Sequence, residues 1–125
     1  MRIERNPIQP HVPTPAKLHQ GGLSTPQVAM DIVDLGLGAA YATHSLGSLS
    51  HAGGYIAGIG HAAMAVGYYS GITPGDKHSR HCKGFGHAIL AAGHIAGAAG
   101  ASGWVLAPLF SGVLITTLQN NRDRL

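Results

Sequence analysis

The feature of this chain that most limits how it can fold is the absence of charged side chains from two long stretches. No Asp, Glu, Lys or Arg occurs between Asp34 and Asp76, or between Lys83 and Arg122. Charged residues normally cover the solvated face of a helix in a water-soluble protein. The uncharged surfaces are therefore expected to lie against lipid, against a partner protein or against further copies of the chain.

The composition supports this expectation. Of the 125 residues, 19 are glycine and only 10% are charged, whereas an ordinary domain has roughly 25% charged residues. Because Ala and Gly bury little apolar area, a core made of them stabilises a small monomer weakly. The net charge of +3 is scattered along the chain, and it does not form the basic face that nucleic-acid binding requires. We expect no nucleic-acid partner.

The clearest helix start is Ser24-Thr25-Pro26, a hydroxyl N-cap followed by a proline in the first turn. Beyond it, apolar residues recur every three or four positions, which predicts a helix with one continuous apolar stripe. The stripe consists of Val28, Ile32, Leu35, Ala39, Ala42, Leu46 and Leu49. Asp34 and Tyr41 fall off it, and Gly53-Gly54 predicts a break or kink.

Further helices are predicted over 55–71, 85–103 and 104–118, with a basic turn over 72–84 that contains Pro74-Gly75. Residues 1–25 carry prolines without a hydrophobic period, so they are predicted to form an extended Pro-rich arm. They also lack the apolar segment of a Sec signal peptide. The predicted fold is all-α: a helical hairpin or four short Gly/Ala-rich helices over 26–121, ending in polar residues 122–125.

Glycines at four-residue spacing predict close helix packing. Gly54 and Gly58 form one such pair, and Gly93 and Gly97 form another; helices in membranes use this small-xxx-small pattern to approach closely. With the long uncharged stretches, it predicts transmembrane helices, a membrane location and homo-oligomers that self-associate through glycine-zipper faces. Burial in a larger protein assembly, as in a filament or shell, is the alternative.

The histidines inside the uncharged stretches admit three interpretations. His51, His61, His87 and His94 are candidate ligands for haem, a chlorin pigment or a divalent metal. A small residue four positions before a histidine, as in Ala57-x3-His61, is similar to the pattern of pigment- and haem-binding membrane helices. Alternatively, protonation of the histidines controls insertion or assembly. In the third interpretation, neutral imidazoles make hydrogen bonds between helices.

The basic turn offers a second candidate metal site. His78, His81 and Cys82 supply nitrogen and sulfur ligands of the kind that zinc prefers. Their spacing matches no strong zinc signature, and a solvated basic turn is the competing interpretation.

Enzyme chemistry finds little support in the sequence. All five carboxylates lie outside the uncharged stretches, and no nucleophile elbow, P-loop or HExxH motif is present. The leading hypothesis is a non-enzymatic, membrane-associated and self-associating helical protein, such as a pore-forming protein or a secreted effector. The alternatives are a His-ligated cofactor- or metal-binding subunit and a soluble self-assembling structural protein.

Overall fold

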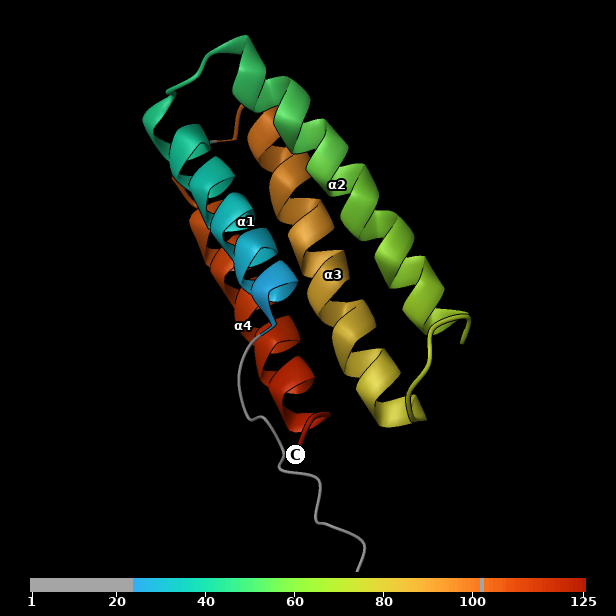
Figure 1. The fold of residues 1–125 in the computed structure, drawn as a ribbon. Helices are drawn as coiled ribbons and strands as arrows, with labels where there is room; N and C mark the ends of the chain where they lie inside the picture. The colour runs from blue at the N-terminus through green and yellow to red at the C-terminus, as the bar shows by residue number, and fades with distance from the viewer. Residues whose placement is uncertain (1–23, 102) are drawn as a thin grey trace, which may run out of the picture.

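The computed structural model describes residues 24–101 and 103–125, which form four α-helices (Figure 1). In chain order these are α1 (Thr25–Thr43), α2 (Ser48–Tyr69), α3 (Lys77–Ala98) and α4 (Leu106–Arg122). The prediction of an all-α fold is confirmed. The predicted Pro-rich arm falls almost wholly outside the described residues.

Helix α3 is the element around which the others are arranged. α2 packs along one side of it and α4 along another, while α1 lies beside α4 and also contacts α3 and α2 (Figure 1). Within the described chain, α2 and α4 do not contact each other. The apolar core therefore forms between α1, α3 and α4 and extends into the segment before α4; it consists of Tyr41, Leu90, Val105, Leu109 and Val113.

Two helices begin at side-chain caps. Ser24 adopts an extended backbone and accepts a hydrogen bond from the Gln27 backbone N–H, as the Ser-Thr-Pro motif predicts. Asp76 caps α3 in the same way by accepting the Ser79 backbone N–H at 3.0 Å. Because of this second cap, α3 begins at Lys77, inside the range 72–84 that was predicted as a turn.

Helix α1 ends earlier than the apolar stripe predicts. It ends at Thr43, where His44 adopts a left-handed conformation with φ 53°, and Leu46 follows with φ 66°. The predicted break at Gly53-Gly54 is wrong, because both glycines lie inside α2. A Cβ on Gly54 would come within 2.9 Å of the Ala98 Cβ, so this glycine permits close packing of α2 on α3.

The interior face of α1 is its more polar face. Its buried residues are Gln27, Asp34, Gly38, Ala40 and Tyr41. The apolar stripe points largely outward, and the Ile32 side chain is 66% exposed. Helix α1 therefore places a carboxylate and a phenol inside the bundle and leaves large apolar side chains at the surface.

The prediction of transmembrane helices is wrong. Across residues 24–101 and 103–125, no helix combines the length and the apolar content that a bilayer crossing needs. Gly, Ser, Tyr and His dilute the apolar residues of α2, three basic residues occupy the first turns of α3, and α4 has only 17 residues. The predicted membrane location is contradicted by the same finding.

The four glycines predicted to pack helices lie at contacts within this chain. Gly54 and Gly97 face Tyr41, Gly58 faces Ile95, and Gly93 faces Leu109. Each is buried, so a side chain at these positions would occupy space already filled by a neighbouring helix. Glycine thus sets how closely α1, α2 and α4 approach α3.

Replacing Gly97 with alanine is expected to destabilise the fold. A Cβ at this position would overlap the ring of Tyr41, which is buried, and overpacking of this kind costs about 1–3 kcal/mol. The matched control is Gly36→Ala in α1, where no atom lies within 4 Å of the new Cβ; this change should stabilise by up to about 1 kcal/mol. Urea unfolding followed by circular dichroism measures both. A Gly97→Ala variant as stable as the parent would contradict this packing.

Candidate metal centre

A carboxylate and two imidazoles from three helices meet in the interior of the bundle. Asp34 of α1 accepts hydrogen bonds on Oδ1 from His61 Nε2 of α2 at 3.0 Å and from His94 Nε2 of α3 at 3.1 Å. The two imidazole rings are parallel, with an interplanar angle of 3° and centroids 5.5 Å apart. One ligand-type atom from each residue lies within 4.8 Å of the others. We call these three residues the Asp34 cluster.

The other nitrogen of each imidazole is also bound. The Tyr41 hydroxyl lies 3.0 Å from His94 Nδ1, and His87 Nδ1 lies 2.9 Å from His61 Nδ1. The His87 ring stacks on His61 and on Tyr68 of α2. The outer partners therefore fix the orientation of both imidazoles that face Asp34.

The Asp34 cluster is withdrawn from solvent. Asp34, His61 and His94 are 2%, 4% and 0% exposed. Burial raises the pKa of the Asp34 carboxyl, but the hydrogen bonds from His61 and His94 outweigh it and lower that pKa to about 2. The centre of the bundle therefore carries an ionised carboxylate at neutral pH, hydrogen-bonded to two histidines.

The charge on Asp34 determines where the protons lie. A carboxylate only accepts, so His61 and His94 both donate from Nε2. When both imidazoles are neutral, each Nδ1 is then an acceptor. It follows that the Tyr41 hydroxyl donates to His94 and the Nδ1–H of His87 donates to His61. In this arrangement all five side chains are joined by hydrogen bonds, and Asp34 carries the one charge. The five are Tyr41, His94, Asp34, His61 and His87.

Two sets of residues at seven-residue spacing bring the Asp34 cluster and its outer partners together. Gln27, Asp34 and Tyr41 are seven apart on α1, and His87 and His94 are seven apart on α3, so each set lies on one face of its helix. The polar residues of α1 thus share the face that packs on α3. On α2, His61 comes three residues after Gly58, on the buried side of that helix.

The donor set suits a divalent transition-metal ion. Two imidazoles and one carboxylate are typical ligands of zinc and of non-haem iron. Ligands about 2.0–2.2 Å from a metal stand about 3–3.5 Å apart, which matches the 3.0 Å and 3.1 Å separations around Asp34. Metal binding through Nε2 requires the proton on Nδ1, and the Tyr41 oxygen and His87 Nδ1 can each accept it. The same side chains can therefore hydrogen-bond with the imidazole protons on Nε2, facing Asp34, or on Nδ1, facing Tyr41 and His87.

The structure brings three of the four predicted cofactor ligands together, namely His61, His87 and His94. His51 lies apart from them at the end of the bundle, where its Nδ1 meets the Ala98 carbonyl oxygen. Asp34 was not predicted as a ligand, because its carboxylate lies just outside the uncharged stretch and off the apolar stripe. Its spacing of seven to both Gln27 and Tyr41 is the signal that identifies it.

The second predicted metal site, in the basic segment, is only partly assembled. His78 Nε2 and Cys82 Sγ are 3.5 Å apart on the exposed first turns of α3. His81 points elsewhere and contacts the Tyr69 ring, with centroids 5.8 Å apart. Among the described residues, the Asp34 cluster is the group of three potential ligands that the structure brings together.

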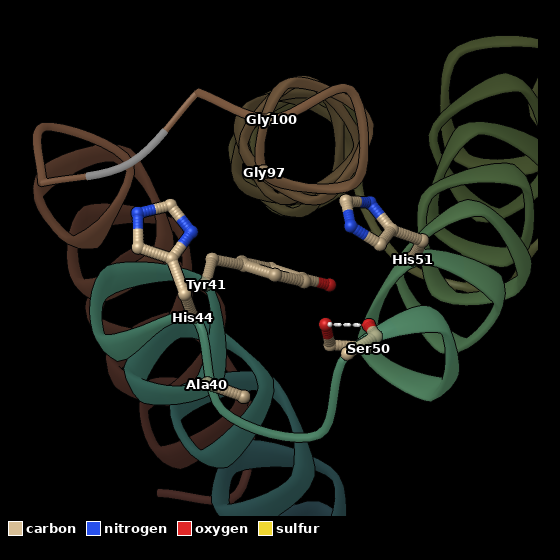
Figure 2. A pocket seen from close by; sticks show the side chains of 8 residues that line it. Ala40, Tyr41, His44, Ser50, His51, Gly97 and Gly100 are labelled. Atoms are coloured by element: carbon tan, nitrogen blue, oxygen red, sulfur yellow. Dashed lines mark hydrogen bonds between the residues drawn. The ribbon is translucent and has the colours of Figure 1, made fainter.

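A small polar pocket lies near His51 at the end of the bundle. Figure 2 shows Tyr41, His44, Ser50 and His51 around it, below the last turn of α3. Its volume is ≈ 50 Å³, which is room for very few water molecules. The Ser50 hydroxyl donates to the Gly47 carbonyl at 2.8 Å (Figure 2), so this hydroxyl is already bound to the backbone at the start of α2.

Comparisons with known proteins add no relative to this description. The chain matches no protein-family model, no curated protein and no solved structure. The fold and the Asp34 cluster are therefore interpreted from the chain's own residues.

The stability of the metal-free protein is expected to fall between about pH 6.5 and pH 4 because of His87. Burial, and next the charge of His61, lower the pKa of His87 from 6.5 to about 4. Between these values the unfolded chain binds a proton that the folded chain does not, so acid favours unfolding there. The loss should be on the order of 2–3 kcal/mol, measured by urea unfolding in the presence of a chelator.

The matched variants are His87→Gln and His81→Gln. Replacing His87 removes this titration and should flatten the stability curve in that pH range, whereas His81 is exposed and its replacement should leave the curve unchanged. An unaltered curve for His87→Gln would show that another group is responsible.

Proposed function

We propose that this protein binds a divalent transition-metal ion through Asp34, His61 and His94. The observation that carries this proposal is the convergence of three buried ligand atoms, one from each of three helices, within 4.8 Å. The histidine-ligand hypothesis from the sequence is kept and narrowed to a metal ion: His61 and His94 remain ligands, Asp34 is added, His87 becomes an outer partner of His61, and His51 is left out.

The electrostatics of the interior favour a cation at this position. An ionised carboxylate with a pKa of about 2 is enclosed in the interior, and the attraction between opposite charges is stronger there than in water. A bound divalent ion would replace the two N–H groups that now face Asp34. Its ligands come from α1, α2 and α3, so binding would link three helices and stabilise the folded state.

Tyr41 and His87, the outer partners of the two imidazoles, also favour metal binding. A metal-bound imidazole holds its orientation best when its second nitrogen donates to a fixed acceptor. Tyr41 is 4% exposed and His87 is 3% exposed, and each contacts one ligand imidazole. The bundle thus supplies the ligands and their supports from residues that are already in place.

The test is a titration of the full chain with Co²⁺ or Zn²⁺, followed by calorimetry and by the visible spectrum of Co²⁺. His78 and Cys82 form an exposed pair, so the background for all measurements is the His78→Asn, Cys82→Ser variant. In that background, one ion per chain is expected. Replacing His94 with Asn should weaken binding by more than about 100-fold, because even outer partners are worth about 10–100-fold.

Graded and matched variants complete this test. Tyr41→Phe removes only the outer partner of His94, and it should weaken binding by about 10-fold. His51→Asn lies outside the cluster and should bind as the background does. Circular dichroism establishes that each variant is folded. Unchanged affinity in His94→Asn, or loss of binding in His51→Asn, would refute the assignment.

Self-association is a second candidate property, and the outer surface of α4 favours it. Large apolar side chains recur every four residues along the helix and are exposed; they are Leu106, Phe110, Leu114 and Leu118. Phe110 and Leu114 also line a groove of ≈ 300 Å³ with Val28 and Ile32 of α1. We infer that a second copy covers this α4 stripe, because ridges at four-residue spacing fit the grooves of an identical helix.

Leu114→Lys is expected to weaken this self-association. A lysine in the middle of the stripe would be desolvated in the dimer, which should raise the dimer dissociation constant about tenfold or more. Sedimentation equilibrium over a concentration series measures it. The control is Ile72→Lys, an apolar side chain that is 82% exposed and lies outside α4. Equal effects of the two substitutions would exclude the α4 stripe as the interface.

A further inference from the structure

A wide apolar groove runs between α1 and α2 and reaches the Asp34 cluster. Its volume is ≈ 520 Å³, within the roughly 300–1,000 Å³ range of small-molecule sites. Its walls are formed mainly by Met30, Val33, Leu37, Leu49, Ile56 and Met64. Large apolar side chains stand open to it, with Val33 56% exposed and Ile56 74% exposed. The groove is open because α1 and α2 contact each other less than any other pair of touching helices does.

The polar groups of this groove are confined to one place. Of the residues that line it, Asp34 and His61 alone carry polar side chains, and neither Lys nor Arg lines it. His94 is 0% exposed and does not line the groove. A ligand in the groove therefore meets apolar walls along its length and borders the Asp34 cluster at the edges of Asp34 and His61, which are 2% and 4% exposed.

The charge of the cluster selects the ligand's polar end. Without a metal, the groove offers an anion no Lys or Arg as a partner. With a divalent ion, one carboxylate and two neutral imidazoles, the cluster has a net charge of about +1, since imidazole ligands are neutral. An anionic oxygen ligand is then attracted, and a three-ligand site leaves coordination positions for it.

We propose that the groove between α1 and α2 binds an apolar chain that ends in a carboxylate, with the carboxylate bound to the metal at Asp34 and His61. This inference rests on the proposed metal-binding function and adds the class of ligand. The apolar chain lies along Val33, Leu49 and Ile56, which removes their exposed surface from water. The two methionines, Met30 and Met64, adapt in shape to chains of different length.

The experiment uses the full chain in the same His78→Asn, Cys82→Ser background, loaded with Co²⁺ and titrated with dodecanoate below its critical micelle concentration. Dodecanoate is expected to shift the visible Co²⁺ spectrum and to bind the loaded protein at least about tenfold more tightly than the metal-free protein. Dodecanol lacks the anionic end and acetate lacks the apolar chain, so each should bind at least about tenfold more weakly than dodecanoate.

A pair of glycine variants places the ligand. Gly60 lines the groove and Gly36 does not, and at both positions a Cβ meets no atom within 4 Å. Gly60→Phe should fill the groove and weaken dodecanoate binding at least about tenfold, whereas Gly36→Phe should not. Both variants should retain the Co²⁺ spectrum measured without dodecanoate.

The outcomes separate the two proposals. Bound Co²⁺ with no spectral response to dodecanoate overturns the ligand assignment and leaves the metal site standing. Equal affinity of dodecanoate for loaded and metal-free protein, or an equal effect of the two glycine variants, also overturns it. Absence of Co²⁺ binding at the Asp34 cluster overturns both proposals.

Discussion

The ionised carboxylate of Asp34, held by two imidazoles in the interior, is the interaction on which the rest of this structure depends. Its hydrogen bonds reach α2 through His61 and α3 through His94. Removing a buried charge from water costs several kcal/mol unless it is paired and fully hydrogen-bonded. Within the described residues, no buried side-chain nitrogen or oxygen lacks a partner. The three helices are thus held in one arrangement by a polar network, and apolar packing fills the remaining space.

This network explains the unusual use of small and apolar residues. Glycine is needed where helices must approach closely enough for short polar side chains to meet, as at Gly97 beside Tyr41. The interior space taken by imidazole and phenol rings is not available to aliphatic side chains, and residues such as Ile32, Ile56 and Phe110 remain exposed. Exposed apolar surface on this scale marks contact sites. Because rings with polar groups fill the interior, the bundle has a buried polar centre and also leaves apolar side chains on its surface.

Local signals in the sequence predicted the helices but not which faces they bury. The cap at Ser24 is a short-range feature that the structure confirms, and the helical periodicity that follows it holds as far as Thr43. The inward orientation of Asp34 depends on His61 and His94, which are 27 and 60 residues away. A rule that places apolar residues inside predicts the wrong buried face for α1, because it does not consider polar partners that come from other helices. The turn after Thr43 was missed for a different reason, since Leu46 adopts a positive φ, which is rare outside Gly, Asn, Asp and His.

The candidate site was predictable in part. Three histidines of the uncharged stretches were predicted as ligands and do converge, because buried imidazoles must find partners. Asp34 was recognisable only from its seven-residue spacing to Gln27 and Tyr41, which is weak evidence without knowledge of the facing helix. His51 lies in the same helix as His61, but it is ten residues, or about 15 Å, nearer the start of α2, and its Nδ1 meets the Ala98 carbonyl oxygen instead.

Helix α1 touches all three of its neighbours, yet within the described chain it makes fewer contacts than any other helix does. The free energy needed to detach an element locally follows the contacts it would lose. Amide hydrogens of α1 would therefore exchange with solvent deuterium sooner than those of α3, which is enclosed by three neighbours. The helix that detaches first carries Asp34, so the bundle opens at its charged centre while α2 and α4 remain packed on α3.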